Sequence, residues 1–151
     1  MAEPEPLFCA LASLLLSVAA SAEERNSGMA ECTTAAQTAT AAAQLRDSGK
    51  PKSEVESTLL QRELAQNTPT GRMMYAALDD VYEFSDVGVF SHYYYRMYTC
   101  VLQQGSEPGP SSFKVVHGGV VACESQHGAS ASGALGVCLM KVIDASSRAG
   151  L

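Results

Sequence analysis

The spacing of hydrophobic side chains in the first part of the chain predicts helices rather than strands. Residues 29–47 carry a narrow apolar stripe with helical spacing, and Gly49 and Pro51 end that segment. The stripe consists mainly of small side chains, which would let another helix approach closely: Met29, Cys32, Ala36, Ala39, Ala43 and Leu45.

Two further helices are predicted before residue 84. Ser53 and Glu56 have the spacing of a capping box, in which each side chain satisfies a backbone amide of the other. Thr68 followed by Pro69 is typical of a new helix start. The predicted buried faces are Val55, Leu59, Leu60 and Leu64 in the second helix, and Met73, Met74, Ala77, Leu78 and Val81 in the third.

The segment after Ser85 and Asp86 has two possible structures. One helical face would hold Phe90, Tyr94, Met97, Tyr98 and Val101. The run of aromatic residues at 92–95 also favours a strand. Helical neighbours favour the helix, so we expect an all-α, four-helix domain over residues 23–104.

The composition of the chain changes at Gly105, and residues 105–151 hold eight of the twelve glycines. We expect this Gly/Ser-rich tail to begin with a linker. Apolar residues on both sides of Gly118 and Gly119 predict a β-hairpin with a two-residue turn. Residues 137–145 are apolar enough to pack on the helical domain as a strand or a short helix. The alternative is that the tail is partly disordered.

The start of the chain resembles an export signal. Residues 7–20 carry no charge, and Ala20-Ser21-Ala22 follows the small-residue pattern of a cleavage site. The run is too short to span a membrane comfortably, since a spanning helix needs about 20 apolar residues. We therefore expect residues 1–22 to be a signal peptide and the protein to be periplasmic or secreted, with no stable membrane anchor. Glu3 and Glu5 replace the usual positive start, so a buried helix of a cytosolic protein is the alternative.

The cysteine count supports export. Removal of residues 1–22 takes away Cys9 and leaves an even number, Cys32, Cys100, Cys123 and Cys138, which is typical of disulfide-bonded proteins. Four cysteines allow three pairings. We favour Cys32 with Cys100, because a helical domain of about 80 residues has a small core and benefits from a cross-link. Cys123 would then pair with Cys138.

Charge and length exclude several classes of function. The formal net charge is −6 and hydrophobic residues make up 46% of the chain. An acidic chain does not favour sequence-independent binding of nucleic acid. So high a fraction of hydrophobic residues is not typical of a wholly disordered protein. The 151 residues are too few for a barrel enzyme. No glycine-rich phosphate loop occurs in the sequence, and we expect no cofactor.

One alternative function is metal binding by the tail. His117, Cys123, His127 and Cys138 are residue types that can hold zinc tetrahedrally. Their spacing lacks the tight pairs that pre-form half of such a site. A disulfide is the simpler use of the two cysteines, so we keep a small metal-binding protein or enzyme as the alternative.

The leading hypothesis is a non-enzymatic module that binds another protein, such as an inhibitor, an immunity-type protein or a small chaperone. Amphipathic aromatic residues and arginine dominate protein interfaces, and His92, Tyr95 and Arg96 would lie opposite the face formed by Tyr94 and Tyr98. Asp79 and Glu83 would share an acidic helical face, which is either solvated or complementary to a basic partner. These five residues are the candidates for partner binding: His92, Tyr95, Arg96, Asp79 and Glu83.

Overall fold

The structure is a computed structural model that describes residues 28–59 and 67–149. Within these ranges the chain is all-helical, which confirms the all-α part of the predicted fold. The predicted signal peptide, Cys9, and Leu60 and Leu64 of the second helix lie outside the described residues. None of the described helices is both long and apolar enough to span a membrane.

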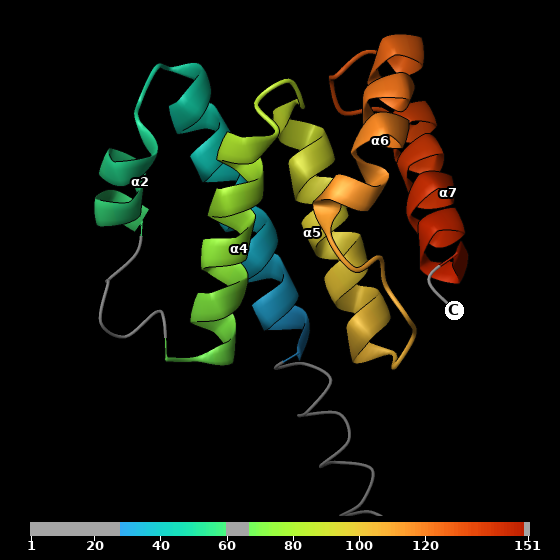
Figure 1. The fold of residues 1–151 in the computed structure, drawn as a ribbon, viewed down its shortest axis with the longest axis horizontal. Helices are drawn as coiled ribbons and strands as arrows, with labels where there is room; N and C mark the ends of the chain where they lie inside the picture. The colour runs from blue at the N-terminus through green and yellow to red at the C-terminus, as the bar shows by residue number, and fades with distance from the viewer. Residues whose placement is uncertain (1–27, 60–66, 150–151) are drawn as a thin grey trace, which may run out of the picture.

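Six helices follow one another in the described part of the chain (Figure 1). An N-terminal helix occupies residues 28–47. The others are α2 (Lys52–Leu59), α4 (Pro69–Glu83), α5 (Val89–Gln104), α6 (Phe113–His127) and α7 (Gly133–Ala149). The start of α4 is as predicted, because the Thr68 side chain accepts a hydrogen bond from the Gly71 amide and Pro69 occupies the first turn.

Helix α5 lies between two groups of helices (Figure 1). On one side, small residues of the N-terminal helix, such as Ala39 and Ala43, form a core with Val55 of α2 and Leu78 of α4. On the other side, α6 and α7 pack with the α4–α5 connection and with α5 itself around Phe113. The predicted strand alternative for the aromatic segment is wrong, because residues 89–104 form α5.

The predicted β-hairpin is wrong. Gly118 and Gly119, expected to form its turn, lie inside α6. Phe113, Val116 and Val120 recur at helical spacing and are buried in the core that α6 shares with α5 and α7, so burial of this face outweighs the turn preference of the two glycines. The described part of the Gly/Ser-rich tail is thus two ordered helices rather than a partly disordered segment.

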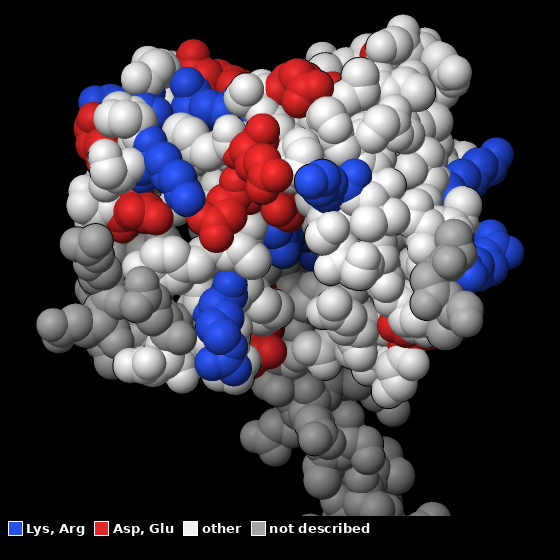
Figure 2. All heavy atoms as spheres, in the orientation of Figure 1, with Lys and Arg blue, Asp and Glu red and all other residues white. Residues whose placement is uncertain are grey.

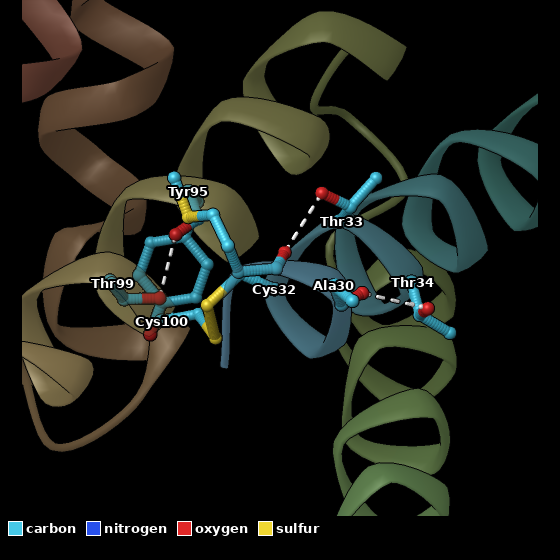
Figure 3. The surroundings of a disulfide bond; sticks show 8 residues. Ala30, Cys32, Thr33, Thr34, Tyr95, Thr99 and Cys100 are labelled. Carbon is cyan, nitrogen blue, oxygen red and sulfur yellow. Dashed lines mark hydrogen bonds between the residues drawn. A yellow bond between two sulfur atoms is a disulfide. The ribbon is translucent and has the colours of Figure 1, made fainter. Parts of the chain in front are cut away.

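Two disulfides join the described cysteines in the expected pairs. Cys32 of the N-terminal helix bonds to Cys100 of α5, next to Tyr95 and Thr99 (Figure 3). Cys123 of α6 bonds to Cys138 of α7. Each bond links two neighbouring helices, and both indicate that the protein matures in an oxidising environment outside the cytoplasm.

Candidate functional site

The connection between α4 and α5 is held by side chains from other helices. Arg46, with 9% of its side chain exposed, donates from Nη1 to the Val81 carbonyl at 2.9 Å and from Nη2 to the Val87 carbonyl at 3.0 Å. Val81 lies in the last turn of α4, where carbonyls lack helical partners. A positive charge there also interacts favourably with the helix dipole. Arg46 therefore caps α4 and fixes the start of the connection to α5.

Glu124 of α6 performs the matching role at the start of α5. The N-cap residue of α5, Gly88, has no side chain to cap the helix. One Glu124 carboxylate oxygen instead accepts from the Gly88 amide at 3.0 Å and from the Ser91 hydroxyl at 2.5 Å. A carboxylate at a helix N-terminus is stabilised by the orphan amides and the dipole. The N-terminus of α5 thus has a fixed position relative to α6.

His92 is a structural residue rather than an exposed recognition residue. It is 1% exposed, stacks on Phe113 with ring centroids 5.0 Å apart, and its Nε2 lies 3.3 Å from the Phe84 carbonyl. Burial lowers the pKa of His92 from 6.5 to about 4, because the charged form would lose its hydration. The imidazole is therefore neutral at pH 7 and donates to the Phe84 carbonyl.

The five predicted partner-binding residues do not form one exposed patch. Tyr95 is buried like His92, because α6 covers the face of α5 that was expected to face solvent. Arg96 binds Asp80 and the Ala76 carbonyl. Asp79 pairs with Lys52 at 2.6 Å, and Glu83 is exposed. Figure 2 shows the acidic side chains gathered over α4, beside a mainly uncharged surface over α6 and α7.

The residues of the alternative metal site are not brought together as ligands. Cys123 and Cys138 are bonded to each other, so neither offers a thiolate. His117 instead lies 3.0 Å from the Asp86 carboxylate through Nε2, and this hydrogen bond lowers the pKa of Asp86. In the described ranges no three His, Cys, Asp or Glu side chains are grouped so that they could hold a metal ion.

A groove of about 790 Å³ lies between the N-terminal helix and the start of α5. We call it the α1–α5 groove, α1 being the helix at residues 28–47. One wall is a single helical face made of Gln37, Thr40, Ala41 and Gln44, at positions i, i+3, i+4 and i+7. The other wall is Val89, Phe90 and Tyr93, and residues 129–131 of the α6–α7 loop close one end. The start of α5 that Glu124 holds borders this groove, since Gly88 lines it, and so does Asp47, the chain neighbour of Arg46.

Sequence reasoning missed this groove. Phe90 was assigned to the buried face of its helix, and residues 129–131 to the Gly/Ser-rich tail, for which no contact with the N-terminal helix was predicted. The available signal was the set of neutral polar side chains opposite the alanine stripe of residues 29–47, of which Gln37 and Gln44 are exposed. That pattern indicates a helix with one free face, but it does not show what faces it.

Comparisons with known proteins give no relative: no protein-family model, curated protein or solved structure matches this chain.

Proposed function

We propose that this chain is an exported, non-enzymatic protein-binding module and that the α1–α5 groove receives its partner. The observation that carries the proposal is the shape and chemistry of the groove, which is open, about 790 Å³ in volume and lined mainly by neutral side chains. Grooves between helices that combine aromatic and small residues are a common site for helical segments of other proteins.

The occupant that fits best is an amphipathic helix of another protein. The wall from Gln37 to Gln44 extends over eight residues, about 10 Å along the helix, which matches roughly two turns of a partner helix. Phe90 and Tyr93 supply apolar surface for its buried side chains, and Ala41 allows a close approach. Asp47, half-exposed at one end, is paired with Arg46 at 2.7 Å, so this ion pair leaves that end of the groove close to neutral.

Rigidity of the walls supports a preformed site. Arg46 and Glu124 fix the ends of α4 and α5 next to the groove, and Cys32–Cys100 links the two helices that form its walls. A preformed site loses less conformational entropy on binding than one that must be ordered first.

Export is supported by two features of the chain. Its disulfides require an oxidising compartment, and residues 7–20 with Ala20-Ser21-Ala22 have the pattern of a cleaved signal. An intact mass of protein isolated from outside the cytoplasm should correspond to a chain that starts at Glu23 with both disulfides formed. A full-length chain with free thiols would contradict export.

Site-specific photo-crosslinking tests the groove. A photoreactive amino acid replaces Gln44, and as a matched control it replaces Lys141, which is exposed on α7 and does not line the groove. In cells that make the protein, we expect one discrete protein adduct from position 44 and none from position 141. A second variant, Ala41→Asp, adds a charge to the groove and should abolish that adduct while the circular dichroism spectrum is retained.

Two results would overturn the proposal. Equal adducts from positions 44 and 141 would show that the contact is not specific to the groove. An adduct that persists in Ala41→Asp at wild-type yield would show that the groove chemistry does not matter.

A further inference from the structure

Helices α1 and α5 lie side by side and run in opposite directions along most of their length. At one end, a Cβ atom added to Gly28 of α1 would lie 2.5 Å from the side chain of Gln104, the last residue of α5. One turn further along, Cys32 bonds to Cys100. At the other end, residues 37–47 of α1 face residues 88–93 of α5 across the α1–α5 groove. The groove is therefore one end of a longer seam between the two helices.

Helix α4 covers one side of this pair, and in Figure 1 it lies in front of α1. Ala39 of α1 shares a buried core with Leu78 of α4. Arg96 of α5 binds Asp80 of α4. On the opposite side of the pair the side chains are exposed or half-buried, as at Met97. In the described part of the chain, the seam is therefore accessible from that side.

A hydrophobic stripe of α5 lies on the accessible side. Tyr93, Met97 and Val101 recur four residues apart and therefore lie along one side of the helix. All three are half-buried, and none of them packs against either of the two cores. Tyr93 stacks on Phe90 of the groove wall with ring centroids 6.5 Å apart, so the stripe continues the groove. Hydrophobic surface outside the cores of a protein is typical of an interaction site.

The accessible side of α1 is equally free of strong polar demands. Met29, with 47% of its surface exposed, and Thr33 precede Gln37 at four-residue spacing. The Thr33 hydroxyl donates to the Met29 carbonyl at 2.9 Å, and the Thr40 hydroxyl donates to the Ala36 carbonyl at 3.1 Å. Both hydroxyls are therefore satisfied within α1 and need no partner from another molecule.

The accessible side of the pair is also uncharged. α1 has no charged residue between positions 32 and 45. Arg96, the only Lys, Arg, Asp or Glu of α5, binds Asp80 on the side that α4 covers. Glu31 follows Met29 by two residues and so points to another side of α1. A partner that buries this surface therefore contacts it with uncharged side chains, because an unpaired charge is costly to bury.

We propose that the partner helix occupies the whole α1–α5 seam, which consists of the groove together with Met29, Thr33, Met97 and Val101. This inference rests on the proposed function, and it sets the length, direction and chemistry of the partner. α5 has 16 residues and is about 24 Å long, so the partner segment is a helix of about four turns that runs along the seam. Its buried side is apolar and uncharged.

The shape of the seam favours a single helix as the occupant. Two helices that lie side by side leave a long concave furrow between them, and a third helix fits such a furrow. A second copy of this chain would present the same furrow, and two furrows are not complementary in shape.

Photo-crosslinking along the seam tests the inference. A photoreactive amino acid replaces Met29, Gln44 or Met97 in separate full-length variants. The matched control is Gln103, which is exposed on α5 but lies on another side of the helix from Met97. In cells that make the protein, we expect positions 29, 44 and 97 to give an adduct with the same partner protein, and position 103 to give none.

Mass spectrometry of the crosslinked peptides tests the direction and length of the partner helix. Positions 29 and 44 are fifteen residues apart on α1, about 22 Å along the helix axis. The partner residues joined to them should therefore lie about 15 positions apart in one helical segment, with the residue joined to position 97 between them. Partner residues from unrelated segments would overturn the inference.

A charge placed on the seam away from the groove provides the second test. Met97→Glu should lower the yield of the adduct from position 44 at least about tenfold, because the partner would have to bury an unpaired carboxylate. Gln103→Glu adds the same charge outside the seam and should leave the yield unchanged. Met97 belongs to neither core, so circular dichroism and urea unfolding of Met97→Glu should match the wild type.

The outcomes separate this inference from the proposed function. An adduct from position 44 that Met97→Glu leaves unchanged, with none from positions 29 and 97, would overturn the inference and confine the partner to the groove. The absence of a specific adduct from position 44 would overturn the proposed function as well. An adduct between two copies of this chain, or equal adducts from position 103, would overturn the inference.

Discussion

At the residue scale, three polar side chains that are at least partly buried each bind a backbone group of the α4–α5 connection. Arg46 binds carbonyls of the α4–α5 connection, Glu124 binds the amide of Gly88, and His92 binds the carbonyl of Phe84. A buried polar group costs free energy unless it is paired. The three side chains therefore define the position of the connection more specifically than apolar contacts would.

His92 makes stability depend on pH. Its pKa is about 4 in the folded protein and near 6.5 in the unfolded chain, so the unfolded chain binds the proton more readily. Above pH 6.5 both states are neutral and the stabilisation is complete. As the pH falls from 6.5 to 4, the free energy of unfolding decreases by up to about 3 kcal/mol.

The variant His92→Gln tests this pH dependence. It removes the titration, so the loss of unfolding free energy between pH 7 and pH 4.5 should be about 2–3 kcal/mol smaller than in the wild type. Urea unfolding at a series of pH values measures it. His127→Gln, on the exposed end of α6, should leave the wild-type slope, and a His92→Gln slope equal to wild type would contradict the assignment.

At the scale of elements, the two adjacent glycines of α6 have opposite roles. Gly118 is exposed, and a Cβ atom there would have no neighbour within 4 Å. At Gly119 a Cβ atom would lie 2.6 Å from Cγ1 of Val142, so α6 and α7 can approach closely only because this position has no side chain. Val142 is β-branched and adapts poorly.

Alanine substitutions should separate the two roles. Gly118→Ala should stabilise the protein by about 1 kcal/mol, because alanine has the higher helix propensity. Gly119→Ala gains the same propensity but overpacks the interface at a cost of about 1–3 kcal/mol, so it should be neutral or destabilising. Urea unfolding of both variants measures the difference. Equal stabilisation by both would show that α6 and α7 do not pack closely at Gly119.

The same two glycines show where sequence reasoning succeeded and where it failed. The helical spacing of residues 73–81 predicted α4 correctly, because one apolar face and a clear N-cap agree. In residues 113–123 a helical face also exists, at Phe113, Val116 and Val120, but the Gly-Gly pair indicated a turn. A glycine in a helix is unfavourable on its own, and only the contact with Val142 explains it.

The candidate sites were less predictable than the helices. His92 and Tyr95 were expected on an exposed face, since the four-helix prediction left α6 out of the core. Once α6 packs on α5 through Phe113, that face is buried. The groove combines residues from two helices and the α6–α7 loop, and spacing within one helix carries no information on such contacts.

At the scale of the whole molecule, the two disulfides should contribute unequally to stability. Cys32–Cys100 joins residues 68 positions apart and Cys123–Cys138 joins residues 15 apart. Each disulfide lowers the entropy of the unfolded chain, which stabilises the folded state by about 4 kcal/mol for the longer loop and about 3 kcal/mol for the shorter one. The double variant Cys32→Ser/Cys100→Ser should therefore unfold at lower urea concentration than Cys123→Ser/Cys138→Ser. The reverse order would contradict this entropic account.

The order of these disulfides along the chain also determines what a single backbone cut would do. Residues 128–132 lie inside the loop closed by Cys123–Cys138, so a protease that cleaves there leaves one covalent molecule until a reductant is added. Residues 105–112 lie outside both loops. A cut in that stretch would leave α6 and α7 attached to the rest of the molecule only by noncovalent packing on α5, as a separable two-helix fragment.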